Sequence, residues 1–257
     1  MRIVVVGATG NIGISVVERL AADPGVDSIV GVARRTPEET LEFAGSERVS
    51  WVPADIRYDD LEPLVEGADA VVHLAWMFQP THHPEVTWST NAIGTSRLIE
   101  AVVATGVRAL VVSSSVAAYS PRANIAPVDE SWPTHGTSTA PYAREKAYVE
   151  RLLDAVEANG EHPRVVRIRP AFVFQARSAS EQQRIFAGPL LPRTLVRPSL
   201  IPALPVPDDL HLQAVHAADV ADAFARAALR DVSGAFNICA DDVLGAAELT
   251  RLFRARR

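Results

Sequence analysis

The chain has one cysteine in 257 residues, Cys239, so it cannot form an intrachain disulfide. A single thiol fits a reducing compartment, and we therefore expect a cytoplasmic protein. No apolar run approaches the ~18 residues that a membrane-spanning helix needs, so membrane insertion is not expected. Acidic side chains outnumber basic ones by 31 to 25, and the sequence has no basic stripe. This charge balance argues against nucleic acid as a partner.

Short apolar runs rich in valine and isoleucine alternate with helical patterns over the first two-thirds of the chain. The expected strands are 2–6, 28–32, 49–52, 70–74, 110–112 and 165–169, and the expected helices include 14–21, 59–66, 85–105 and one that starts at 141. Such runs are typical of parallel strands buried on both faces. The alternation predicts an α/β fold with a doubly wound parallel sheet.

A glycine-rich turn lies between the first strand and the first helix. Glycines at 7, 10 and 13 permit a tight turn, close approach of a pyrophosphate to backbone N–H groups, and close helix–strand packing. A plain strand-to-helix turn is the alternative. The residues expected to contact a dinucleotide here are Gly7, Thr9, Gly10, Asn11, Ile12 and Gly13.

The end of the second strand bears on the choice of cofactor. NAD sites usually carry an acidic residue there for the ribose 2′-hydroxyl, whereas an arginine accommodates a 2′-phosphate. This chain has Arg34 and Arg35 and no acid. We therefore predict NADP, with Arg34 the better candidate; the alternative is NAD with both arginines exposed to solvent.

Other candidate cofactor contacts follow the third and fourth strands. Asp55, followed by Ile56, can accept a hydrogen bond from adenine, although a cap of the 59–66 helix is a competing interpretation. Leu74 and Ala75 lie at the carboxyl edge of the sheet, where ligands bind in such folds. His82 and His83 have no further ligand at metal-binding spacing, so no metal site is expected.

The fifth strand ends in Ser113-Ser114-Ser115, and a later helix carries Tyr142 and Lys146. Residues four apart share a helix face. An ammonium near a phenol can lower the phenol pKa by roughly 1–3 units, so Tyr142 is a candidate proton donor and acceptor near neutrality. A serine hydroxyl at the strand end would hold a carbonyl or alcohol oxygen. A packed ring and a solvated amine are the plainer alternative.

Together these motifs resemble the extended short-chain dehydrogenases/reductases, of the NAD-dependent epimerase/dehydratase type with a Rossmann-type sheet. The matching pieces, in the family's order, are Gly7-x-x-Gly10-x-x-Gly13, Asp55-Ile56, His73-Leu74-Ala75, Asn91-x-x-Gly94, Ser113-Ser114-Ser115, Tyr142-x-x-x-Lys146, Arg169-Pro170 and His216-Ala217-Ala218-Asp219-Val220.

The resemblance implies a role for each matching residue. Tyr142 would be the acid/base, and Lys146 would lower its pKa and bind the nicotinamide ribose. Ser115 would be the catalytic hydroxyl, with Ser114 its neighbour, and Asn91 would support the active-site helix. Ser113 and Pro170 join the candidate cofactor contacts. The resemblance also implies a homodimer, packed through the 85–105 and 142–157 helices.

Two departures from the family pattern limit the function. Dehydratases usually have an Asp-Glu pair after the catalytic hydroxyl, but this chain has Val116-Ala117, which disfavours dehydration. Sugar-nucleotide epimerases usually have an asparagine soon after the 165–169 strand, where this chain has the segment 174–177. Arg177 or Arg184 could meet an anion instead, unless both are simply exposed.

The C-terminal third differs in character. Six prolines within 188–207 predict a stiff cover over the reactive end of the cofactor. Asp219 is expected to cap a helix at 220–229. Relatives often continue for several dozen residues past the point that corresponds to Arg257, so we expect a small, reduced substrate-binding portion. We assign residues 1–174, rejoined by about 212–240, to a dinucleotide-binding domain, and 175–211 plus 241–257 to the substrate portion.

The leading functional hypothesis is hydride transfer at a carbonyl or secondary alcohol carbon of an unidentified small molecule. Two rivals stay open. One is a nucleotide-sugar epimerase, which oxidises and re-reduces the same carbon. The other is a dinucleotide-binding sensor without turnover.

Overall fold

The computed structural model describes residues 1–37, 41–78, 83–122, 126–160, 163–178, 207 and 210–253. The chain divides into two compact units. The first comprises Met1–Pro170 and Ala217–Ile238, and the second comprises Ala171–His216 and Cys239–Arg257. Within the described ranges, no helix is long and apolar enough to cross a membrane.

The first unit contains a seven-stranded sheet in which every neighbouring pair is parallel. The order is β3-β2-β1-β4-β5-β6-β9. The strands are β1 (Arg2–Val6), β2 (Ser28–Ala33), β3 (Val49–Pro53), β4 (Ala70–His73), β5 (Ala109–Ser113), β6 (Arg164–Pro170) and β9 (Gly234–Ile238). This arrangement confirms the predicted doubly wound sheet.

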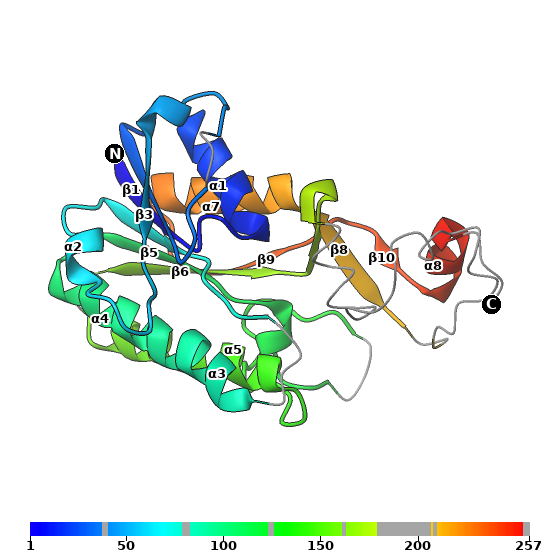
Figure 1. The fold of residues 1–257 in the computed structure, drawn as a ribbon. Helices are drawn as coiled ribbons and strands as arrows, with labels where there is room; N and C mark the ends of the chain where they lie inside the picture. Colours follow the sequence, from blue (N-terminus) through cyan, green and yellow to red (C-terminus); the bar gives the residue numbers. More distant parts are fainter. Residues whose placement is uncertain are drawn as a thin grey trace. The chain divides into compact units, whose positions relative to one another are not determined.

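Helices cover both faces of this sheet (Figure 1). On one face α1 (Asn11–Ala21) packs along α7 (Ala217–Leu229). On the other lie α2 (Glu62–Val65), α4 (Thr95–Ala104) and α5 (Pro141–Ala158). The core beneath α4 and α5 includes Leu98, Leu110 and Leu153, each almost completely buried. Burial of a leucine side chain contributes roughly 1.5–3 kcal/mol, so this layer fixes α5 against the sheet.

Several predicted helices differ from the observed ones. The 59–66 helix shrinks to α2, and the 85–105 helix is divided into α3 (Pro84–Trp88), a π-helical segment (Ser89–Gly94) and α4. Gly106 has the positive φ expected of a residue that ends a helix. We predicted that Asp219 caps the helix at 220–229. It does not, because α7 starts at Ala217, two residues before Asp219 and directly after β8 (Leu212–His216).

The second unit contains a three-stranded sheet of order β10-β8-β7. Here β7 (Phe172–Phe174) runs parallel to β8, while β10 (Val243–Leu244) runs antiparallel to it and is followed by α8 (Ala246–Phe253). We predicted that the residues of β7 and β8 belong to the dinucleotide-binding part; in the structure the two strands pair with each other in this unit. The proline-rich segment 188–207 lies outside the described residues except for Pro207, as do His82 and Arg184.

Candidate active site

The predicted site residues of the first unit gather at one edge of its sheet. The strands are parallel, so their carboxyl ends share that edge. Following the strand order, the edge carries Asp55 and Ile56 after β3, Arg34 and Arg35 after β2, Gly7 to Gly13 after β1, Leu74 and Ala75 after β4, Ser113 to Ser115 at the end of β5, and Pro170 at the end of β6.

The glycine-rich turn is packed too tightly for side chains at two of its glycines. Gly7 has a φ of 90°, and a Cβ added there would lie 2.4 Å from the Ala75 nitrogen. A Cβ on Gly13 would lie 2.2 Å from the Gly7 carbonyl oxygen. The N-cap of α1, Gly10, provides no capping side chain, and the first turn of α1 has no acidic residue. The positive end of α1, which has neither a side-chain cap nor an acidic residue, therefore suits the pyrophosphate of a dinucleotide.

The residues after β2 are exposed to solvent, whereas those after β3 are held by other parts of the chain. Arg34 and Arg35 are exposed. The Asp55 carboxylate instead accepts hydrogen bonds from Arg57, at 2.6 to 3.1 Å. These bonds, assisted by the charge of Arg34, lower the pKa of Asp55 although burial opposes them. Asp55 does not cap α2, whose N-cap is Leu61, so that competing interpretation is wrong. Ile56 is buried.

Ser115, Tyr142 and Lys146 converge where β5 meets α5. We call Ser113–Ser115 the serine turn. Ser115 Oγ accepts a hydrogen bond from the Ala117 backbone nitrogen at 3.1 Å, and the Ser115 side chain lies close enough to Tyr142 to affect the pKa of the phenol. Lys146 Nζ donates to the Ser113 carbonyl oxygen at 2.7 Å. The expected shared face of Tyr142 and Lys146 is thus turned toward the serine turn.

Burial dominates the electrostatics of these groups. It lowers the pKa of Lys146 to about 7, against the opposing charges of Glu150 and Glu145. It raises the pKa of Tyr142, against the opposing effect of Ser115. The expected lowering of the Tyr142 pKa by Lys146 is therefore not found in this structure, in which Nζ lies 5.7 Å from the Tyr142 ring centroid. The phenol is protonated at neutral pH.

Aromatic rings surround Tyr142 and Lys146. Lys146 Nζ lies 3.3 Å from the centroid of the Trp76 ring, a cation–π contact. Trp76 and Phe78 meet the Tyr142 ring edge-on, at 5.8 and 4.7 Å between centroids. His73, also close by, bonds to the Thr95 hydroxyl at 2.8 Å. Burial, followed by the charge of Lys146, lowers the His73 pKa to about 3, so this imidazole is neutral.

Asn91 faces inward from the π-helical segment and is fully buried. Its amide accepts a hydrogen bond from the Met77 backbone nitrogen at 2.7 Å and donates one to the Met77 carbonyl at 3.0 Å. It also donates to Glu145 Oε2 at 2.7 Å. The buried amide thus has the partners that we expected it to need, and it ties the segment after β4 to α5.

Two buried carboxylates that were not predicted from the sequence, Glu145 and Glu150, flank Lys146. Glu145 accepts hydrogen bonds from Asn91 and from the Thr87 hydroxyl, the latter at 2.6 Å. Glu150 accepts one from Ser114 Oγ at 2.5 Å, so the Ser114 hydroxyl is committed to a carboxylate. The spacing of four between Lys146 and Glu150 is a signal that could have revealed Glu150.

The two segments that depart from the family pattern each form a short 3₁₀ turn. Val116 and Ala117 belong to a short 3₁₀ turn, Val116–Ala118, that follows Ser115 directly. They supply no acidic group beside the hydroxyl. Arg177 is exposed in another 3₁₀ turn, Ala176–Ser178, in the second unit.

Comparisons with known proteins agree with this fold. The chain is 32% identical over 160 residues to the UDP-glucose 4-epimerase of Mycolicibacterium smegmatis, covering 60% of this chain and 50% of that protein. The UDP-N-acetylglucosamine 4-epimerase from Methanobrevibacter ruminantium, solved in complex with UDP-N-acetylmuramic acid, has a TM-score of 0.79 at 22% identity, covering 98% of this chain and 80% of that one.

A short-chain dehydrogenase/reductase superfamily protein from Agrobacterium tumefaciens, solved with bound NAD, has a TM-score of 0.78 at 22% identity, covering 98% of this chain and 81% of that one. At such identities the structural likeness shows the fold alone. The chain spans only half the length of the M. smegmatis epimerase. The sequence profile of the NAD dependent epimerase/dehydratase family matches residues 3–239, which confirms the resemblance drawn from the motifs. The chain therefore belongs to the NAD dependent epimerase/dehydratase family.

Proposed function

We propose that the protein is an NAD(P)-dependent oxidoreductase that acts on a carbonyl or secondary alcohol carbon of a small molecule. The observation that carries this proposal is that Ser115, Tyr142 and Lys146 lie together: Ser115 is close enough to Tyr142 to affect the pKa of the phenol, and the Lys146 amine, one helical turn away, donates to the Ser113 carbonyl. These groups lie at the same sheet edge as the glycine-rich turn, whose tight packing and open helix N-terminus suit a dinucleotide pyrophosphate.

Each side chain has a distinct task in this proposal. A bound nicotinamide supplies or removes the hydride. Ser115 fixes the substrate oxygen, and Tyr142 donates its proton to that oxygen during reduction. The raised pKa of Tyr142 keeps the phenol protonated at neutral pH, so it is ready to act as the acid. General acid catalysis of this kind is worth roughly 10²–10⁴ in rate. Lys146 binds the nicotinamide ribose.

The test compares Tyr142→Phe with the wild-type protein. Calorimetry with oxidised and reduced NAD and NADP first measures cofactor binding. Ketones and nucleotide sugars are then screened by the absorbance of the reduced nicotinamide. We expect Tyr142→Phe to lose turnover roughly 10²–10⁴-fold and to keep cofactor binding. Tyr148→Phe is the matched control, because Tyr148 is on the same helix but packs against Trp88. Substantial activity in Tyr142→Phe would refute the role of Tyr142.

For the cofactor we favour NADP over NAD. Two exposed arginines follow β2, and no acidic residue stands there for a ribose 2′-hydroxyl. The charge of Arg34 also reaches Asp55 at the next strand end. Replacing Arg34 with Ala should weaken NADPH binding about tenfold or more and leave NADH binding nearly unchanged. Arg230→Ala, an exposed arginine at the end of α7, is the control.

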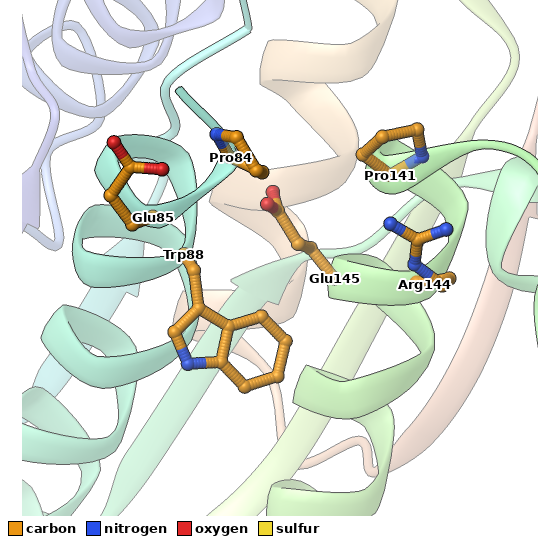
Figure 2. A pocket seen from close by; sticks show the side chains of 6 residues that line it. All are labelled: Pro84, Glu85, Trp88, Pro141, Arg144 and Glu145. Carbon is orange, nitrogen blue, oxygen red and sulfur yellow. The ribbon is translucent and has the colours of Figure 1, made fainter. Parts of the chain in front are cut away.

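We also propose a homodimer formed through α3, α4 and α5. Large apolar side chains are exposed on these helices, among them Trp88 and Tyr148, whose rings lie 4.8 Å apart. Beside them the surface has a hollow of about 270 Å³, in which Trp88 of α3 and Glu145 of α5 lie between these two helices (Figure 2). The hollow is lined by Pro84, Glu85, Trp88, Pro141, Arg144 and Glu145. Exposed apolar patches of this kind mark interaction surfaces.

Sedimentation analysis tests the dimer. Trp88→Asp should convert a dimer to a monomer, because it places a charge among the exposed apolar side chains of these helices. Val243→Asp, at an exposed valine in β10, should leave the dimer intact. A wild-type monomer, or a Trp88→Asp dimer, would contradict the proposal.

A nucleotide-sugar epimerase is the second candidate, favoured by the similarity to the M. smegmatis UDP-glucose 4-epimerase. An epimerase restores its cofactor in each cycle, whereas a reductase consumes NADPH. Net consumption of NADPH during turnover therefore separates the two. In either case we assign substrate binding to the second unit and dinucleotide binding to the first. The cytoplasm stays our prediction for the compartment, based on the single cysteine.

A further inference from the structure

The serine turn is attached to α5 by three successive contacts. Each residue of the turn meets a different residue of the helix, and the three helix residues follow one another at intervals of four. The pairs are Ser113 with Lys146, Ser114 with Glu150, and Ser115 with Tyr142. Only the Ser115 pair presents a hydroxyl and a phenol suited to a substrate oxygen. The contact between Ser114 and Glu150 therefore needs a different explanation.

Glu150 is held by more than Ser114. Its side chain is only 1% exposed. Arg169 forms two hydrogen bonds to the carboxylate, from Nε to Oε1 and from a terminal nitrogen to Oε2, both at 2.9 Å. Arg167 Nε lies 3.0 Å from Oε2. Arg169 is fixed in turn, since it donates to the Tyr119 hydroxyl at 3.0 Å and to the Glu130 carbonyl at 2.9 Å. The carboxylate thus has little freedom to move.

We propose that Glu150 is a positioning residue for the reaction proposed above. Fixed by Arg169, it holds the Ser114 hydroxyl and so sets where Ser115 meets Tyr142. It does not touch the reacting atoms, because its carboxylate is buried between α5, β6 and the serine turn. The inference rests on the proposed function for its catalytic meaning, but the arrangement can be tested without turnover.

The same carboxylate acts on the charge of Lys146. The titratable groups that face Lys146 are Glu145, Glu150 and Tyr142 on α5 and His73 on β4. Burial lowers the pKa of Lys146, and Glu150 opposes this more strongly than Glu145. Removing the charge of Glu150 should therefore lower the pKa of Lys146 below its present value of about 7. Without that charge, the Arg169 guanidinium would also lose its carboxylate partner nearby.

Lys146 is the only lysine in the chain, so its titration can be observed directly. Protein labelled with ¹³C-lysine gives one lysine side-chain signal, which is followed by NMR across pH. We expect the titration midpoint of Glu150→Gln to fall by about one pH unit or more relative to wild type. Glu157→Gln is the matched control: Glu157 is on the same helix and bonds to Arg167 at 2.7 Å, but its side chain is 38% exposed. Its midpoint should equal that of the wild type.

A second variant keeps the inference testable if Glu150→Gln does not fold. Ser114→Ala leaves the carboxylate and its arginines in place and removes only the link to the serine turn. In ¹³C-tyrosine-labelled protein, we expect the Tyr142 ring signal to shift while the signal of the exposed Tyr58 stays unchanged. An unchanged Lys146 midpoint in Glu150→Gln, or an unchanged Tyr142 signal in Ser114→Ala, would overturn the inference. Neither measurement requires a substrate, so failure here is distinct from failure to find turnover.

Discussion

The buried amine of Lys146 should make the stability of the fold depend on pH in a predictable direction. In the unfolded chain a lysine has a pKa near 10.4 and keeps its proton through pH 9. In the folded chain burial lowers the pKa to about 7. Between these two values the unfolded state binds more protons, so the free energy of unfolding must rise with pH. The contribution is smallest below pH 7 and complete above the unfolded pKa.

The substitution that isolates this effect is Lys146→Met, which keeps a long unbranched side chain and removes the titratable amine. One pKa unit corresponds to 1.36 kcal/mol, so the wild type should gain about 2 kcal/mol over Lys146→Met between pH 7 and pH 9. The neighbouring His73 does not titrate there, because its pKa is about 3. The Tyr142 phenol, whose pKa is raised, stays protonated throughout.

The assay is chemical denaturation of both proteins at several pH values from 6 to 9. Arg144→Met is the control, because it removes an exposed cation from the same helix. Its difference from wild type should not change with pH. A wild-type minus Lys146→Met difference that is equally flat would refute the buried, nearly neutral amine.

Two further predictions follow from close packing. Gly13→Ala should abolish dinucleotide binding measured by calorimetry, since its Cβ would lie 2.2 Å from the Gly7 carbonyl oxygen. Gly10→Ala should weaken binding less, because its Cβ would lie 3.3 Å from the same oxygen. Equal effects of the two variants would contradict the packing of the turn. Leu153→Ala should lower the free energy of unfolding, measured by urea denaturation, by about 2–5 kcal/mol. Val103 is 44% exposed, so Val103→Ala should lower it by less than about 0.5 kcal/mol. Similar losses in the two variants would contradict the assigned core.

The sequence predicted most of the first unit because its signals are local. A buried parallel strand is a short apolar run, and a glycine turn after such a run marks the sheet edge. The serine run at the end of β5 and the spacing of four between Tyr142 and Lys146 were enough to predict that Ser115, Tyr142 and Lys146 lie close together. Helix boundaries were less predictable. Nothing local marks the π-helical segment around Asn91, whose side chain bonds to Glu145 on a distant helix.

What the sequence could not supply is the balance of burial against charge. Whether Lys146 lowers the pKa of Tyr142 depends on how much solvent reaches both groups, which is a property of packing. The rings of Trp76 and Phe78 come from the segment after β4 and close around Tyr142. The partner of Ser114 was likewise hidden, because Glu150 becomes its neighbour only when α5 lies against β5 and β6.

Transfer of isotope from labelled cofactor tests the central claim most directly. The reduced nicotinamide carries deuterium at its transferable position, and the product of a substrate found in the screen is examined by mass spectrometry. The account predicts one deuterium on the carbon that bears the oxygen with the wild-type protein, and the same labelled product formed roughly 10²–10⁴-fold more slowly with Tyr142→Phe. A product without deuterium, or a labelled product formed equally fast by both proteins, would contradict it.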